Sequence, residues 1–177
     1  MLLTSVIFSE TINIPDDYLT IQEGINVAVD GDTVLVADGD YQENLVIGKS
    51  IVLASHAIFD DLDDWVAYDD VFYEEWIINN SHIENTQIIG NSPDDEDYAS
   101  VILITPNSDT CISPEIIGFT IKYGTGTVVY RSVDDSPDNE RYSVRLGGGI
   151  LADVSDPIIK YNFFKQNGTP PNGSPTT

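Results

Sequence analysis

The spacing of apolar residues changes near residue 30. Before that point, from residue 20 to residue 29, apolar side chains recur at the three- and four-residue spacing of a helix. These positions are Ile21, Ile25, Ala28 and Val29. The pattern predicts a short amphipathic helix over 20–29, which the Asp30-Gly31 pair ends because Gly tolerates the positive φ of a helix stop.

The start of this predicted helix reads Thr20-Ile21-Gln22-Glu23, which has the form of a capping box. In a capping box the Thr hydroxyl accepts the backbone N–H of the Glu, and the Glu carboxylate accepts that of the Thr. The predicted structural cap consists of Thr20, Ile21, Gln22, Glu23 and Ile25.

After residue 32 the apolar residues form short β-branched runs that end in Gly, Asp or Ser. The runs cover residues 33–39, 44–50 and 51–56. No segment between them is long enough to form a crossover helix between parallel strands. Short strands joined by tight turns are typical of a solenoid.

A solenoid predicts an internal repeat, and the chain contains an irregular one. An aliphatic residue is followed by a core residue five positions later and by a small or amide residue eight positions later. The copies are Val46–Ile51–Ala54, Ile83–Ile88–Asn91, Ile116–Ile121–Gly124 and Ile159–Phe164–Asn167. Their uneven spacing predicts turns with insertions of different length, and the amides Asn162 and Asn167 are predicted to occupy corners or ladders.

The insertions hold most of the acidic residues, at 59–75, 92–98 and 133–142. The whole chain has 30 Asp and Glu against 7 Lys and Arg, a formal charge of −23. Such a charge repels phosphate backbones and so argues against a nucleic-acid partner. The distribution of this charge predicts acidic loops outside a packed core. Separately, the sequence has no run of the ~18 apolar residues that a membrane span needs.

Residues 14–55 resemble the opening of right-handed parallel β-helix proteins of the pectin-lyase-like superfamily. The resemblance lies in Ile21-Gln22, in Gly31 to Val34 and in the Gly39 to Glu43 turn, and 118–124 and 147–168 resemble later coils. It implies an all-β fold, a right-handed parallel β-helix with a short N-terminal capping α-helix. The helix would lie across the first coil and bury Ile21, Ile25 and Val29.

The resemblance implies a division of the chain into a leading segment, one domain and a tail. Residues 12–168 form the predicted β-helix domain, incomplete at its C-terminal end, and 169–177 form a Pro/Gly/Ser tail. Residues 1–11 are interpreted as the remnant of a signal peptide or as an N-terminal strand. An uncapped C-terminal end exposes strand edges, so self-association or further coils are expected there. The single cysteine, Cys111, excludes an internal disulfide and is predicted to be a core residue.

The superfamily includes polysaccharide lyases, pectin methylesterases and polygalacturonases, but the motifs of the last two are absent. A pectate lyase uses calcium and a basic residue that takes a proton. The basic residues considered are Lys122, Arg131, Arg141 and Arg145, and none lies in a recognisable motif. No catalytic residue is therefore predicted.

The acidic insertions are candidate Ca²⁺ sites, because calcium takes six to eight oxygen ligands in flexible geometry. The candidate cation-binding residues are Asp60, Asp61, Asp63, Asp64, Asp94, Asp95 and Asp97. A solvated acidic surface that keeps the protein soluble is the alternative.

Aromatic residues in the first insertion are candidates for carbohydrate binding, because flat rings stack on sugar faces. They are Trp65, Tyr68, Tyr73 and Trp76. The alternative is a small hydrophobic cluster that pins the insertion to the solenoid. His56 and His82 flank the insertion and are predicted to be structural.

The sequence therefore predicts an exported, non-catalytic β-helix module, secreted or at the cell surface, directed to a polysaccharide. One alternative is the N-terminal part of a carbohydrate-active enzyme such as a polysaccharide lyase. The other is a structural spacer of a large surface protein, because this scaffold carries many functions.

Overall fold

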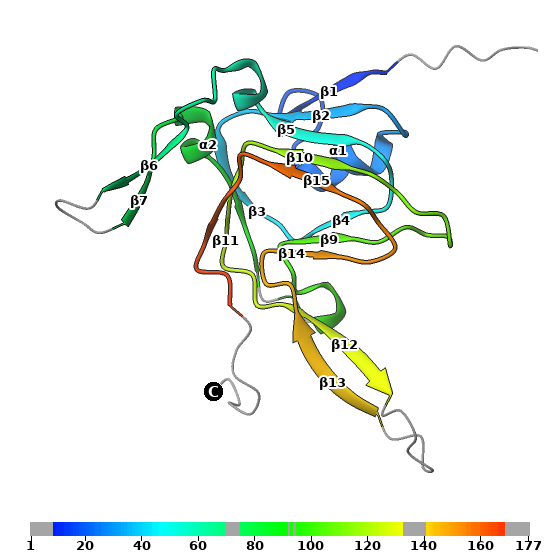
Figure 1. The fold of residues 1–177 in the computed structure, drawn as a ribbon. Coiled ribbons are helices and arrows are strands. Elements are labelled where there is room, and N and C mark those ends of the chain that lie inside the picture. Colours follow the sequence, from blue (N-terminus) through cyan, green and yellow to red (C-terminus); the bar gives the residue numbers. More distant parts are fainter. Residues whose placement is uncertain (1–8, 70–74, 92, 94, 133–140, 169–177) are drawn as a thin grey trace, which may run out of the picture.

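A computed structural model of the chain describes residues 9–69, 75–91, 93, 95–132 and 141–168. The described part is mostly β, with three sheets of parallel strands that the chain visits in turn (Figure 1). The expectation of a β-rich fold with parallel sheets is thereby confirmed. Residues 1–8 and 169–177, which include most of the predicted leader remnant and the tail, lie outside the described residues.

Sheet A contains five strands in the order β1-β2-β5-β10-β15 (Figure 1). They are β1 (Thr11–Ile14), β2 (Thr33–Val36), β5 (Val52–Ser55), β10 (Glu115–Ile117) and β15 (Ile158–Lys160). Sheet B has the order β3-β8-β11-β16 and sheet C the order β4-β9-β14. Their strands are β3 (Gly39–Gln42), β8 (Thr86–Ile89), β11 (Thr120–Lys122), β16 (Phe163–Lys165), β4 (Leu45–Ile47), β9 (Ile102–Ile104) and β14 (Ile150–Ala152).

The strands stack in register, so equivalent residues of successive layers form columns. The first column in sheet A runs Ile12–Val34–Leu53–Ile116–Ile159, and one in sheet B runs Tyr41–Ile88–Ile121–Phe164. The members from Ile12 to Ile116 in the first column all belong to one buried core cluster. Burial of these apolar columns between the three sheets is the main stabilising contribution.

The N-terminal helix α1 spans Ile21–Val27 and has the predicted cap. The Thr20 hydroxyl accepts the N–H of Glu23 and the Glu23 carboxylate accepts the N–H of Thr20, each at 3.2 Å. Ile21 and Ile25 are buried as predicted. Val29 lies beyond the helix and is 56% exposed, so its predicted burial was wrong. The helix ends earlier than residue 29, which turns the chain before Val29 can face the core.

Polar groups of the first layer fasten α1 at both of its ends. The Glu43 carboxylate accepts the N–H groups of Ile21 and Gln22, at 2.9 and 3.0 Å. At the other end the Lys49 ammonium donates to the carbonyl oxygens of Asn26 and Ala28. These charges face the partial charges of opposite sign at the helix ends, which is the favourable orientation.

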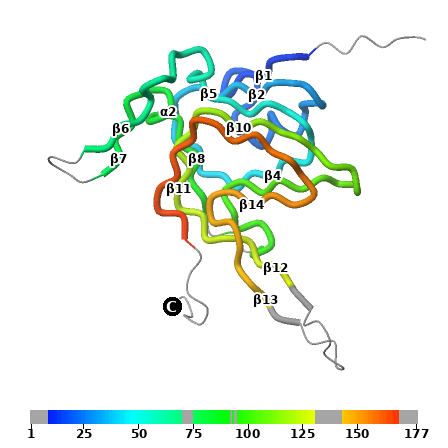
Figure 2. Tube along the Cα trace, viewed as in Figure 1, coloured from blue at the N-terminus to red at the C-terminus, as the bar shows by residue number. Residues whose placement is uncertain are grey.

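Two insertions interrupt the layers and project from the sheets (Figures 1 and 2). The first lies between β5 and β8 and contains η1 (His56–Phe59), β6 (Val66–Asp69), β7 (Glu75–Ile78) and α2 (Ser81–Asn85). The second is the antiparallel hairpin of β12 (Thr127–Ser132) and β13 (Arg141–Leu146). A shorter segment before β9 carries η2 (Glu96–Tyr98). The acidic stretch 133–140 lies outside the described residues.

The predicted repeat is correct for its last two copies. Ile116 pairs with Ile159, and Ile121 pairs with Phe164. In the earlier copies Ile88 does share the column of Ile121, but Ile83 lies on α2 and Val46 lies in sheet C. Ile83 was assigned to the wrong element because the first insertion separates β5 from β8, and Val46 because its strand belongs to a different sheet from β10 and β15.

The corners of the layers also repeat. Gly118 has a φ of +82°, and an added Cβ would lie 2.6 Å from the Ser55 hydroxyl, so this position requires Gly. The Asn162 side chain accepts the N–H of Phe119 and donates to the carbonyl of Ile116, at 2.9 and 2.8 Å. The side chain of Asn167 likewise bridges the layer of β11, confirming both predicted corner amides. Cys111 is exposed, so its prediction as a core residue was wrong.

Candidate functional site

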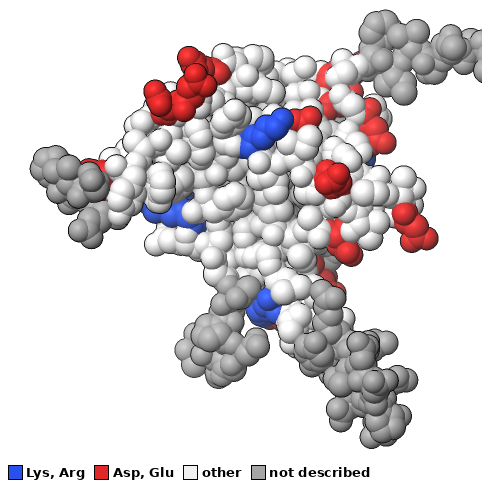
Figure 3. All heavy atoms as spheres, viewed as in Figure 1, with Lys and Arg blue, Asp and Glu red and all other residues white. Residues whose placement is uncertain are grey.

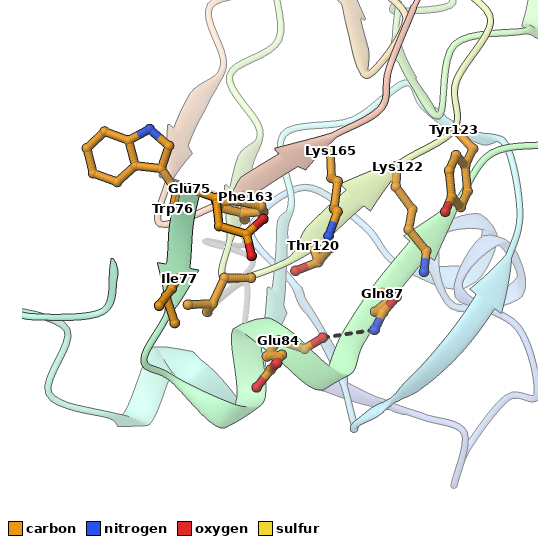
Figure 4. A pocket seen from close by; sticks show the side chains of 11 residues that line it. Glu75, Trp76, Ile77, Glu84, Gln87, Thr120, Lys122, Tyr123, Phe163 and Lys165 are labelled. Atoms are coloured by element: carbon orange, nitrogen blue, oxygen red, sulfur yellow. Dashed lines mark hydrogen bonds between the residues drawn. The ribbon is translucent and has the colours of Figure 1, made fainter. Parts of the chain in front are cut away.

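A cleft of about 300 Å³ lies on the outer face of sheet B, bounded by the first insertion (Figure 4). Strands β8, β11 and β16 form its floor, while β7 and α2 form one side. Its lining residues are Glu75, Trp76, Ile77, Ile78, Glu84, Gln87, Thr120, Lys122, Tyr123, Phe163 and Lys165. This lining combines aromatic rings with charges of both signs.

The strand alternation explains why these side chains point outward. Ile121 is fully buried in the core, so its neighbours Thr120 and Lys122 face the opposite side of the sheet. The parallel register then places Lys165 directly beside Lys122, and Phe163 beside Thr120. Figure 4 shows the Lys122 and Lys165 side chains side by side and extending in the same direction. Neighbouring like charges on one sheet face are unfavourable for folding unless opposite charges compensate them, and Glu75 and Glu84 line the same cleft.

Two exposed aromatic rings stand on either side of the lysine pair (Figure 4). Trp76 is 60% exposed and Tyr123 is 47% exposed. The Lys122 ammonium lies 5.4 Å from the centre of the Tyr123 ring, within range of a cation–π contact. Tyr123 has a φ of +65°, a backbone conformation that is uncommon for residues other than Gly.

The first insertion holds Trp76 in place through two contacts. Tyr68 pairs with Trp76 across the β6–β7 hairpin, with ring centres 5.2 Å apart. At the base of the insertion, the Asp60 carboxylate lies 2.8 Å from Asn80 Nδ2 and 2.8 Å from His82 Nδ1. Asn80 and His82 hold the pKa of Asp60 below its ordinary value, because their hydrogen bonds favour the carboxylate. His82 also meets His56 edge to face, which supports structural roles for both histidines.

The structure places the aromatic residues predicted to bind carbohydrate in different surroundings. Trp76 lies in the cleft and Tyr68 packs against it. Trp65 instead packs edge to face on Tyr161 of the last layer, with ring centres 6.2 Å apart. That contact is the predicted alternative, a small cluster that pins the insertion. Tyr73 lies outside the described residues.

The predicted cation ligands have other partners or lie apart. Asp60 binds His82 and Asn80, while Asp61 and Asp95 accept the N–H groups of Asp63 and Asp97 within tight turns. Asp61, Asp63 and Asp64 line a separate hollow with Trp65. Within the described ranges no group of three or more His, Cys, Asp or Glu is placed to hold a metal ion. Asp94 lies outside those ranges, and a calcium site stays a prediction.

Of the basic residues considered from the sequence, Lys122 lies in the cleft. Arg145 is committed elsewhere, because its guanidinium pairs with Glu96 and donates to the carbonyl of Gly126. The side chains of Arg131 and Arg141 lie outside the described part of the chain.

Sequence reasoning missed Lys165, Tyr123, Gln87 and Glu84 as members of this site. The signal for Lys165 was present, since Lys122 and Lys165 each follow the core residue of a recognised repeat copy. Glu75, Glu84 and Gln87 carry no such signal. The two glutamates come from the first insertion, and Gln87 comes from the strand that follows it. Figure 4 shows the hydrogen bond from the Gln87 amide to the Glu84 carbonyl that helps to order this side.

No family model matches the chain, and no curated protein matches it. Among the described residues, no helix is both long enough and apolar enough to cross a membrane.

Proposed function

We propose that the chain is a right-handed parallel β-helix that binds an anionic polysaccharide in the cleft on sheet B. Three features support the fold: three parallel sheets visited in turn, in-register apolar columns, and a helix across the first layer. The right hand follows from the strong preference for right-handed connections between parallel strands of one sheet.

The observation that carries the ligand class is the lysine pair between two exposed rings. Lys122 and Lys165 are direct neighbours on β11 and β16, and together they offer two ammonium groups on the floor of the cleft. The rings of Trp76 and Tyr123 offer flat apolar faces, and Gln87 and Glu84 offer hydrogen-bonding groups. A carboxylated sugar chain has the matching chemistry, with acidic groups, apolar ring faces and hydroxyls.

The lysine pair lies on a molecule that is otherwise strongly acidic. The chain carries a formal charge of −23, and Figure 3 shows few basic residues among the acidic ones on the face drawn there. An anionic polymer is repelled by most of such a surface, so a site for it needs a local positive charge. Binding through this pair weakens as salt is added, because exposed charges are screened over about 10 Å at 0.1 M salt.

The role proposed for the module is binding outside the cell, without catalysis. The apolar start of the chain, which resembles part of a signal peptide, supports export. Calcium has no part in this proposal.

The test measures binding to polygalacturonate and to a neutral glucan by affinity electrophoresis. We expect polygalacturonate to retard the chain and the Lys122→Ala/Lys165→Ala variant to bind at least about tenfold more weakly, as for the loss of charge-assisted contacts. Trp76→Ala is expected to weaken binding as well. Tyr130→Ala is the matched control, because it removes an exposed ring outside the cleft. Equal retention on the neutral glucan, or no effect of the double variant, would contradict the proposal.

One observation favours a second candidate, a polysaccharide lyase. Lys122 lies in the cleft beside the groups that would hold the sugar, where a base for proton abstraction is needed. Incubation with polygalacturonate would then produce unsaturated uronic products, detected by their ultraviolet absorbance. Products that Lys122→Ala abolishes, with retention on the polymer unchanged, would favour the lyase over the binding module.

A further inference from the structure

The last layer exposes residues whose neighbours in the inner layers of the same columns are fully buried. In sheet A, Val34, Leu53 and Ile116 are fully buried, whereas Ile159 at the end of the same column is 42% exposed. In sheet B, Phe164 is 47% exposed beside the fully buried Ile121. Among the described residues, no segment covers the outer face of this last layer of core residues.

The backbone of β15 is also unpaired on its outer side within the described residues. The Ile158 N–H donates to Pro114, and the Lys160 carbonyl accepts from Gly118, so these groups face β10. In a parallel ladder, the backbone N–H and C=O groups of successive residues point alternately to one neighbouring strand and to the other. The N–H and C=O of Ile159 consequently face the open edge, next to its exposed side chain.

The opposite edge of sheet A is blocked. The Asn13 N–H donates to the Asp17 carboxylate at 2.7 Å, and the Asp17 N–H donates to the Asn13 carbonyl at 2.8 Å. The turn that holds Asp17 therefore occupies the outer backbone groups of β1 and protects that edge from strand addition. Growth of a continuous stack of copies needs two open ends, and sheet A has one.

We propose that the C-terminal end docks onto the same end of a second copy around a two-fold axis. Strand β15 pairs with β15 of the other copy in antiparallel fashion, with Ile159 opposite Ile159. Such an interface is isologous and closed, because it uses both open ends and leaves the blocked ends outside. The product is a dimer.

Charge complementarity supports this occupant. Asp156 and Lys160 are four residues apart along an extended segment, so they lie on the same side of it, and Asp156 is exposed. In the antiparallel register centred on Ile159, each Lys160 is diagonal to both Asp156 and Lys160 of the other copy. The symmetry makes two Asp156–Lys160 pairs. With Glu115 beside Lys160, the carboxylates at this contact outnumber the two ammonium groups and compensate their repulsion. Lys160 also lies 3.4 Å from Glu115 of its own copy and is half exposed, so its ammonium can contact both carboxylates.

Sedimentation velocity over a wide concentration range tests the proposal. We expect a 19.4 kDa monomer to convert to a dimer as concentration rises. Ile159→Asp is expected to weaken dimerisation at least about tenfold by placing a charge in the apolar contact. Val27→Asp is the matched control, since Val27 is 47% exposed at the blocked end, and it is expected to leave the dimer unchanged. A circular dichroism melt confirms that each variant is folded.

A charge swap adds a readout that a general loss of structure would not give. Asp156→Lys and Lys160→Asp are each expected to weaken the dimer, and the double variant is expected to restore it. A monomer at every concentration would overturn the proposal, as would assemblies larger than a dimer. Equal weakening by Val27→Asp and Ile159→Asp, or a double variant as weak as the single ones, would overturn it too.

Discussion

The two ends of the sheet stack differ in every respect that protects a β-structure. At the N-terminal end, α1 buries Ile21 and Ile25, and Asp17 occupies the edge of β1. At the C-terminal end, Ile159 and Phe164 continue the core columns but are about half exposed, at 42% and 47%. The same kind of residue in the same column is thus stabilising or available for contact, depending on whether another layer covers it.

The largest difference in the effect of a substitution on stability is expected along the first column of sheet A. Ile116→Ala should lower the free energy of unfolding by about 2–5 kcal/mol, because Ile116 is fully buried and its truncation leaves a cavity. Ile159→Ala, one layer further, should cost less than about 1 kcal/mol in the monomer, because its side chain already contacts solvent. Urea denaturation of both variants measures the difference. Equal losses would mean that the last layer is covered as well as the inner ones.

A smaller effect is expected at the closed end from Glu43→Gln. The Glu43 carboxylate accepts two N–H groups at the start of α1, and the amide can replace it only with weaker, uncharged bonds. The expected loss is at most about 1.5–3 kcal/mol, the range for hydrogen bonds to charged groups. Glu84→Gln is the control, since Glu84 is exposed on α2 far along the chain. An unchanged urea midpoint for Glu43→Gln would show that α1 is held by its apolar contacts alone.

The smallest effect is expected on the pH dependence of stability. Hydrogen bonds from the N–H groups of Glu10 and Val29 lower the pKa of Asp32 from its ordinary value of 3.8. A lowered pKa in the folded state gives stability that is complete above the ordinary value and lost as pH falls through the lowered one. Asp32→Asn should therefore flatten the fall of stability below about pH 4. Asp156→Asn, at the open end, is the comparison in urea denaturation over a pH series, and an equal flattening there would contradict the assignment to Asp32.

Most local features of the fold could be predicted from the sequence. The capping box at Thr20 and Glu23, the burial of Ile21 and Ile25, and the corner amides Asn162 and Asn167 depend on residues close in sequence or on a short repeat. The predictions for Val29 and for the first two repeat copies failed because they depended on where a helix ends and on where strands and insertions begin. Neither kind of boundary leaves a periodic signal. The predicted burial of Cys111 failed as well.

The candidate site was predictable only in part. Trp76 and Lys122 were singled out for their chemistry, but for different reasons and without a link between them. Trp65, which looked equivalent to Trp76, packs on Tyr161 instead. Which of two similar residues faces a cleft depends on the path of the insertion, and that path is set by contacts such as Asp60 with His82.

The repeat of the last two layers, the N-terminal helix with its cap and the acidic character of the chain follow from local spacing and composition, so they could be predicted from the residues alone. Tertiary contacts were needed to place Lys165 beside Lys122, to bring Trp76 to the same cleft and to leave Ile159 half exposed. Those relations join residues from different layers, and parallel stacking sets them through long-range register rather than through neighbours in the chain.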